Sequence, residues 1–191
     1  MKKLFIILFL AAIFAASSSA QLTNMITFDD LGTNEVVAPP HYLDQGVVLH
    51  SQESGYLFGA PTRQRTGQAL WVNGNSVDRR EVVIDFYLPS SSSPGTISEF
   101  YVYIRAPGGW TIEYWGPNGE FFGRYSSTEE GVGTSFAPDM RPHRLLLYGE
   151  VPWSDLSIDD LQLSDITPVP EPTAIAILGL GLATIVRWRR R

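Results

Sequence analysis

Short runs of β-branched and aromatic residues, bounded by Gly, Pro, Ser or Asn, recur throughout the chain from residue 21 to residue 167. The two longest runs are residues 81–88 (EVVIDFYL) and 97–105 (ISEFYVYIR). No window of this segment repeats its apolar residues with the period of 3.6 that an amphipathic helix requires. Short strands at this spacing predict an all-β fold, an antiparallel β-sandwich of the jelly-roll type over residues 21–167. The shorter candidate strands are residues 25–28, 46–50, 69–73, 143–148 and 156–163.

The clearest local prediction is a β-hairpin. Residues 110–115 run into Gly116-Pro117-Asn118-Gly119, and the chain returns through residues 120–125. Asn-Gly tolerates the positive φ of a tight turn. Trp110 and Trp115 are five residues apart, so their side chains point to opposite faces of one strand and one of them should face outward. Because exposed aromatic rings stack on sugar rings, Trp110 and Trp115 are candidates for glycan binding. The alternative is that both fill the core, as large aromatic residues usually do.

The N-terminus has the three parts of a secretory signal peptide. Two lysines follow the initial Met, residues 4–16 are an unbroken apolar run, and Ser18-Ser19-Ala20 offers small residues for cleavage. We therefore predict a signal peptide over residues 1–20, handled by the Sec translocon and signal peptidase and cut before Gln21. The alternative is a membrane anchor, but 13 helical residues reach only about 20 Å across a hydrocarbon core of roughly 30 Å.

The C-terminus combines a proline-rich segment, an uncharged apolar run and a basic end. Residues 173–186 carry no charge, which predicts a transmembrane helix, and the arginines behind them act as a stop-transfer signal on the cytoplasmic side. The alternative is a buried core helix, beside which consecutive arginines fit poorly. Fourteen residues span only about 21 Å, and Trp188 with snorkelling arginines lengthens that span. The flanking residues are Val169, Pro170, Glu171 and Pro172 on one side, and Arg187, Arg189, Arg190 and Arg191 on the other.

This order of features over residues 168–191 resembles the PEP-CTERM sorting signal. In that family the signal is held in the inner membrane and processed by an exosortase, a membrane-bound protease. The family occurs in Gram-negative cell envelopes and is linked with exopolysaccharide and the biofilm matrix. The resemblance implies a precursor held transiently in the inner membrane and a mature protein at the cell surface or in the extracellular matrix.

The segment between the two ends is acidic and has no lysine. Residues 21–167 contain eight arginines and 19 acidic residues, a formal charge of −11. Such a surface repels nucleic-acid phosphates, so we exclude nucleic acid as a partner. It suits a neutral glycan, a cation or simple solubility outside the cell. Since the chain has no Cys, it can form no disulfide, thiol nucleophile or cysteine zinc site.

Two aspartate pairs lie near the ends of the predicted sandwich. Asp29 and Asp30 follow the first candidate strand, and Asp159 and Asp160 lie in the last one. First and last strands often pair, so the four carboxylates are expected to approach, and a calcium ion would neutralise their repulsion. Phe28-Asp29-Asp30 and Ile158-Asp159-Asp160 also resemble the opening and closing fragments of jelly-roll surface-adhesion and carbohydrate-binding modules, which implies a structural calcium. The alternative is that one aspartate of each pair faces solvent while the other caps a turn.

The sequence contains no catalytic motif of the metalloprotease, nucleophile-elbow, Walker or dinucleotide-binding type. A Ser-His-Asp set or a glycosidase carboxylate pair can be assembled from distant residues, so a secreted hydrolase remains an alternative. We predict a non-enzymatic, exported and surface-sorted protein. The main alternative is a calcium-stabilised carbohydrate-binding module that engages exopolysaccharide.

Overall fold

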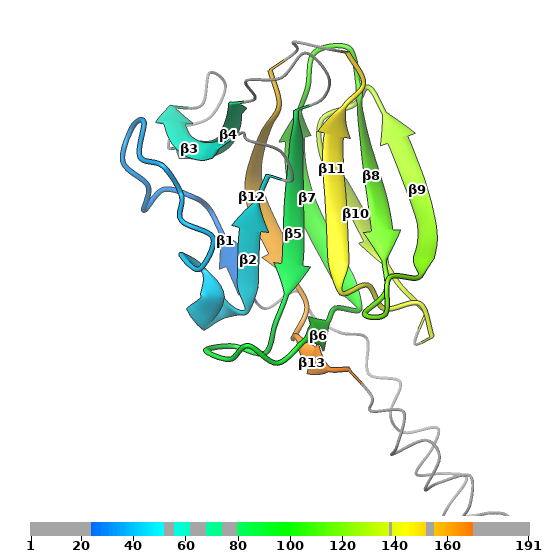
Figure 1. Ribbon diagram of the computed structural model, residues 1–191. Coiled ribbons are helices and arrows are strands. Elements are labelled where there is room, and N and C mark those ends of the chain that lie inside the picture. Colours follow the sequence, from blue (N-terminus) through cyan, green and yellow to red (C-terminus); the bar gives the residue numbers. More distant parts are fainter. Residues whose placement is uncertain are drawn as a thin grey trace, which may run out of the picture.

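The computed structural model describes residues 24–51, 56–61, 68–73, 80–137, 139–151 and 155–169. Their regular secondary structure is almost entirely β (Figure 1), and the only helical turn among the described residues is a 3₁₀ turn at Leu43–Gln45. No helix in this described part is long and apolar enough to cross a membrane. The predicted signal peptide, the apolar run 173–186 and the terminal arginines lie outside the described residues, as do Pro170, Glu171 and Pro172.

Two antiparallel sheets pack face to face, with the five-stranded sheet in front in the view of Figure 1. Its strand order is β2 (Val47–His50), β5 (Glu81–Phe86), β11 (Arg144–Gly149), β8 (Trp110–Trp115) and β9 (Phe121–Ser127). The six-stranded sheet has the order β10 (Val132–Ser135), β7 (Glu99–Arg105), β12 (Ser157–Leu163), β4 (Gln68–Asn73) and β3 (Tyr56–Pro61), and β1 (Asn24–Ile26) also pairs with β12. A separate two-stranded sheet joins β6 (Gly95–Thr96) to β13 (Thr167–Pro168).

The chain alternates between the two large sheets, as β10, β11 and β12 illustrate. This is the predicted all-β antiparallel sandwich with jelly-roll-like crossings, and the fold prediction is confirmed. The core lies between the sheets, where alternate side chains of the central strands are buried. In β5 these are Val82, Ile84 and Phe86, all fully buried. Burying one such side chain stabilises the fold by about 1.5–3 kcal/mol.

The predicted hairpin is β8 and β9, which pair from Trp110↔Ser127 to Trp115↔Phe121. Its turn differs in one detail from the expectation, because only Gly119 has a positive φ, at 81°, and Asn118 does not. The Gly119 N–H donates to the carbonyl of Gly116 (3.1 Å), and the Gly116 N–H donates to the carbonyl of Glu120 (2.7 Å). In a loop built around such an i→i+3 turn, the left-handed conformation is needed only at the residue that follows the turn.

The expected pairing of the first candidate strand with the last one is also present. β1 lies antiparallel to β12, with Ile26 opposite Leu161. β12 itself is irregular between Asp159 and Gln162, and Asp160 adopts a positive φ of 47°.

Candidate functional site

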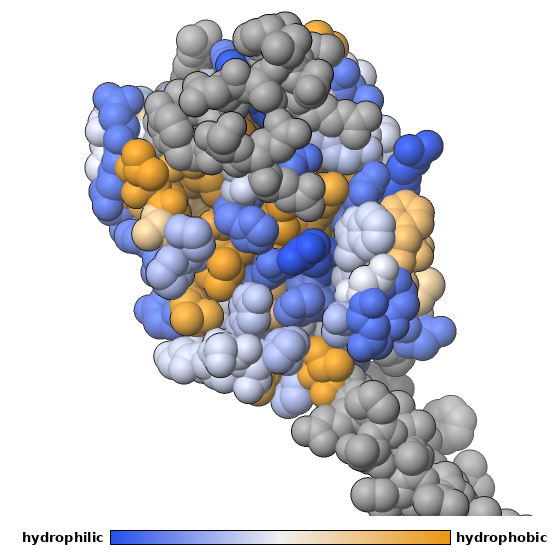
Figure 2. All heavy atoms as spheres, in the orientation of Figure 1, coloured by the Kyte–Doolittle hydropathy of each residue, from blue (hydrophilic) through white to orange (hydrophobic). Residues whose placement is uncertain are grey.

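The five-stranded sheet has an outer face that points away from the core. Strand alternation turns Ile84, Ile112 and Leu145 inward, where they are fully buried, and turns their neighbours outward. Figure 2 shows hydrophilic residues gathered in the middle of this side of the molecule, with hydrophobic residues around them. We call the outward residues of this sheet the outer face: Val48, His50, Glu81, Val83, Asp85, Thr111, Glu113, Trp115, Phe121, Arg124, Ser126, Arg144, Leu146 and Tyr148.

One row of the outer face crosses all five strands. The strand registers place Val48 opposite Asp85, Asp85 opposite Arg144, Arg144 opposite Trp115, and Trp115 opposite Phe121. We call this set of five residues the first row. Because neighbouring strands lie about 4.8 Å apart, the first row is about 19 Å long. A row of this length can lie against several units of an extended polymer.

Asp85 is the charged centre of the first row and is only 3% exposed. Arg144 reaches it side-on, donating from Nε to Oδ1 (2.5 Å) and from Nη2 to Oδ2 (2.9 Å). His50 donates from Nε2 to Oδ2 at 3.1 Å. Burial alone would raise the pKa of Asp85, but the hydrogen bonds from His50 and Arg144 outweigh it and hold this pKa at about 2. The hydrogen bonds to Asp85 in turn raise the pKa of Arg144, so the pair stays ionised at neutral pH.

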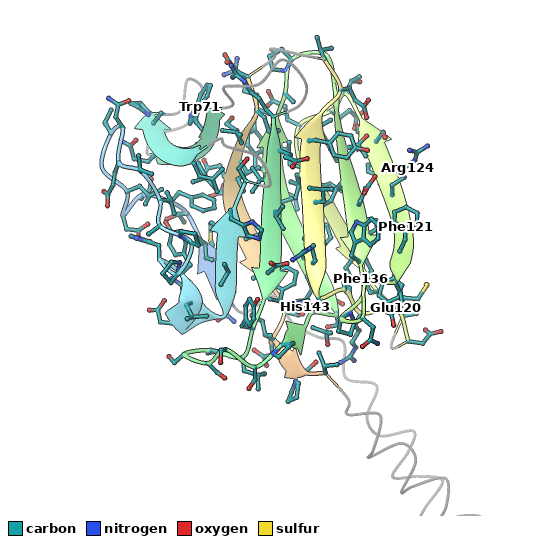
Figure 3. The ribbon with its side chains drawn as sticks, in the orientation of Figure 1. Trp71, Glu120, Phe121, Arg124, Phe136 and His143 are labelled. Carbon is teal, nitrogen blue, oxygen red and sulfur yellow. The ribbon has the colours of Figure 1, made fainter. Side chains whose placement is uncertain are left out.

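Two aromatic rings form the other end of the first row. The rings of Trp115 and Phe121 lie 5.1 Å apart between centroids at an interplanar angle of 59°, and Phe121 is 51% exposed. The Trp115 indole donates from Nε1 to Oε2 of Glu113 (3.2 Å), and the Tyr148 hydroxyl donates to Oε1 of the same carboxylate (3.1 Å). Glu113 therefore holds the indole and the Tyr148 hydroxyl in place. Figure 3 shows Phe121 and Arg124 along the outer strand β9.

A pocket of about 200 Å³ opens at the Trp115 end of the first row. His143 lines it and is labelled in Figure 3 at the lower end of β11. Its Nδ1 lies 2.9 Å from the carbonyl oxygen of Gly95. Because a carbonyl oxygen can only accept, Nδ1 carries the proton, and Nε2 of the neutral ring is an acceptor. The full lining is Trp115, Gly116, Pro117, Gly119, His143 and Arg144.

Of the two tryptophans singled out in the sequence, only Trp115 lies on the outer face. Trp110 points into the core, is 1% exposed, and donates from Nε1 to the carbonyl of Glu129 at 2.7 Å. Its ring packs beside that of Tyr125, with centroids 5.8 Å apart. As expected, one tryptophan of the pair faces outward. Trp115 therefore remains the candidate for glycan binding, and Trp110 is part of the core.

Three of the four aspartates of the calcium prediction, Asp29, Asp30 and Asp159, accept hydrogen bonds from the protein itself. Asp30 accepts from the Tyr42 hydroxyl (2.8 Å) and lies 3.0 Å from Nε2 of His41. Burial opposes ionisation of Asp30, yet these two hydrogen bonds outweigh it and lower its pKa. Asp29 accepts from the backbone N–H of Gln68 (2.9 Å), and Asp159 accepts from that of Asp160 (2.8 Å).

Within the described residues, no three His, Asp or Glu side chains are grouped so that they could hold a metal ion. Calcium binding at Asp29, Asp30, Asp159 and Asp160 therefore stays a prediction.

The sequence did not single out His50, Asp85 and Arg144 as a site. The register of three strands brings them together, and the bonded pair Asp85 and Arg144 is 59 positions apart. One signal was available, because a charged residue interrupts an apolar strand in EVVIDF and begins one in RLLLYG. Such a residue has to find a partner once its strand is buried.

Comparison with known proteins identifies the tail. Residues 168–191 match the model of the PEP-CTERM protein-sorting motif. This match confirms the predicted motif, which implies export, a membrane-held precursor and exosortase processing. No curated protein matches the chain.

Several solved structures are similar to this chain at low sequence identity. Endo-1,4-β-D-xylanase 10B of Clostridium thermocellum, solved as its CBM22-1 and GH10 modules with xylohexaose, is 14% identical with a TM-score of 0.44. That similarity covers 74% of this chain but spans only 28% of the xylanase chain.

Two isolated modules show a similar likeness. The family 29 carbohydrate-binding module CBM29_1 of Piromyces equi is 7% identical with a TM-score of 0.46, over 74% of this chain and 90% of its own. The CBM22-1 xylan-binding domain of Paenibacillus barcinonensis Xyn10C is 12% identical with a TM-score of 0.44. That similarity covers 81% of this chain and 100% of the xylan-binding domain. This chain thus carries a PEP-CTERM sorting motif directly behind a β-sandwich body.

Proposed function

We propose that this chain is an exported, non-enzymatic protein that an exosortase sorts to the cell surface, and that its β-sandwich then binds a neutral polysaccharide on the outer face. The match of residues 168–191 to the sorting motif supports the first part. The fixed pair of rings at Trp115 and Phe121, beside the hydrogen-bonded charges of the first row, is the observation that carries the second part.

The sorting step can be tested in cells that express the protein. Glu171 lies in the Pro-Glu-Pro part of the matched motif. In the Glu171→Gln variant we expect unprocessed protein to accumulate in the inner-membrane fraction. Glu129→Gln, an exposed acid in the β9–β10 turn, is the matched control and should be processed normally. Normal processing of Glu171→Gln would contradict the role of the motif.

Polysaccharide binding follows from the chemistry of the first row. A sugar ring has an apolar C–H face and a rim of hydroxyl groups, so it can stack on Trp115 while its hydroxyls bond to charged groups beside the ring. The charges of Arg144 and Asp85 are already paired, which leaves hydrogen-bonding capacity without net charge. Because residues 21–167 carry a formal charge of −11, an anionic polymer would be repelled. The outer face therefore suits a neutral glycan.

The binding proposal is tested by retention on neutral exopolysaccharide in affinity electrophoresis. We expect Trp115→Ala to weaken binding about tenfold, which corresponds to about 1.4 kcal/mol. Tyr125→Ala is the matched control, because Tyr125 is a 50% exposed aromatic on the same hairpin whose ring packs against Trp110 rather than on the outer face. The bound polysaccharide should release no new reducing ends. Unchanged retention of Trp115→Ala, or no retention of the native protein, would contradict the proposal.

A further inference from the structure

A short two-stranded sheet joins one end of the sandwich to the residues that lead into the C-terminal tail. In the two-stranded sheet of β6 and β13, which we call the clasp, Thr167 lies opposite Thr96 and Pro168 opposite Gly95. The Thr167 hydroxyl donates to the Thr96 carbonyl (3.3 Å) and accepts from Nη1 of Arg141 (3.4 Å). The chain is thus held against the body up to Pro168, which is the first residue of the matched sorting motif.

Ser164 and Ile166, which precede the clasp, contact the body directly. Ser164 is fully buried, and its hydroxyl oxygen accepts from the backbone N–H groups of Ser98 (3.0 Å) and Glu99 (3.1 Å). Ile166 packs on Gly95 so closely that a Cβ placed on this glycine would lie 2.3 Å from Cγ2 of Ile166. No flexible linker therefore lies between the body and Pro168.

The clasp limits how far the body can lie from a membrane that holds the tail. Only residues 169–172 separate the clasp from the apolar run that begins at Thr173. Four residues span at most about 14 Å when fully extended. The polar headgroup layer on one side of a bilayer takes up about 5–8 Å of that distance. The part of the body next to the clasp must then lie within about 10 Å of the headgroups.

That part of the body is the end formed by residues 87–94, 116–119 and 139–143, which we call the base. Contacts join it to the clasp, because His143 donates to the Gly95 carbonyl and Arg141 donates to the Thr167 hydroxyl. Figure 1 shows β6 and β13 at this end, with the strands of the five-stranded sheet running away from it. Residues 87–98 contain no charged side chain, although the sandwich is strongly acidic. Anionic lipid headgroups would repel this loop less than the rest of the surface.

We infer that in the membrane-held precursor the clasp seats the base of the sandwich on the lipid surface and directs the opposite end, which carries Val151, away from it. The inference rests on the proposed sorting function, because it requires the tail to be in a membrane. The outer face then stands upright on the bilayer, with its strands leading away from the lipid.

The absence of cysteine allows a clean labelling test with the full tail in place. A fluorophore is attached either at Ser92→Cys, which is exposed at the base, or at Val151→Cys, which is 46% exposed at the far end. The protein is reconstituted in vesicles of phosphatidylethanolamine and phosphatidylglycerol that carry a nitroxide-labelled headgroup. We expect quenching at position 92 to exceed quenching at position 151 at least threefold.

A ten-residue Gly-Ser insertion after Val169 provides the matched control. It adds a flexible spacer with a root-mean-square length of about 17 Å, so the difference between the two positions should largely disappear. Equal quenching at both positions with the native tail, or a difference that survives the insertion, would overturn the inference. If the protein does not float with the vesicles at all, the proposed membrane-held precursor fails as well, and flotation alone distinguishes that outcome.

Discussion

Arg144 and Asp85 form a side-on ion pair across β11 and β5, with contacts of 2.5 Å and 2.9 Å, at the centre of the outer face. The carboxylate is nearly inaccessible, whereas the side chain of Arg144 is 40% exposed. Asp85 therefore serves to position Arg144, and Arg144 is the member of the pair that a ligand can reach.

Removing the arginine should expose how much this pairing stabilises the fold. Arg144→Ala leaves a buried carboxylate with His50 as its remaining partner, and we expect it to lower the free energy of unfolding by about 2 kcal/mol. Arg124→Ala, an exposed arginine on the same face, should change it by less than about 0.5 kcal/mol. Urea unfolding of both variants measures the difference, and equal effects would contradict a stabilising role for the pair.

The lowered pKa of Asp85 predicts a loss of stability in acid. The pKa of an unfolded aspartate is about 3.9, and that of folded Asp85 is about 2. The stabilisation from the ionised form is thus complete above pH 4 and is lost as the pH falls from about 4 to about 2. Over this range the free energy of unfolding of the native protein, measured with urea, should fall by about 2 kcal/mol more than that of the Asp85→Asn variant. If the free energy of unfolding fell equally with pH in both proteins, Asp85 would not be the group responsible.

Ser164 should be sensitive to loss of a single oxygen atom. In Ser164→Ala the backbone N–H groups of Ser98 and Glu99 lose an acceptor in a buried site. We expect the free energy of unfolding to fall by about 2 kcal/mol, because an unsatisfied buried donor costs about 1–3 kcal/mol. Ser92→Ala, at an exposed loop position, is the control and should have the stability of the native protein in thermal unfolding.

Calcium binding at the two aspartate pairs can be tested by chelation. A bound calcium ion would have to compete with the hydrogen bonds that Asp29 accepts from Gln68 and Asp30 accepts from Tyr42. If calcium binds, EDTA should lower the thermal midpoint of the purified protein and added calcium should restore it, since a ligand stabilises only the state that binds it. An unchanged midpoint would contradict the calcium prediction.

Strand positions could be predicted from the sequence where an alternation of apolar and polar residues was bounded by turn-forming residues. The β8–β9 hairpin follows such signals, whereas the pairing of β1 with β12 was expected only because first and last strands often pair. β10 (Val132–Ser135) and β3 (Tyr56–Pro61) were missed, because the first reads VGTS and the second contains Gly and Pro, which disfavour strands in isolation. Both form because a neighbouring strand offers hydrogen-bond partners.

The candidate site was only half predictable for a similar reason. Alternation places either Trp110 or Trp115 outward, but only the packing of Trp110 against the core decides which. The pairing of Asp85 with Arg144 depends on strand order, and local sequence contains no information on which strands become neighbours.

The central claim is that both apolar ends are removed from an exported protein and that the acidic sandwich between them is the working part. The most direct measurement is the intact mass of the protein recovered from the cell surface or culture medium. We expect a species that begins at Gln21 and lacks residues 173–186, well below the 21.2 kDa of the full chain. Recovery of the full-length mass, or of a surface form that keeps residues 173–186, would contradict the claim.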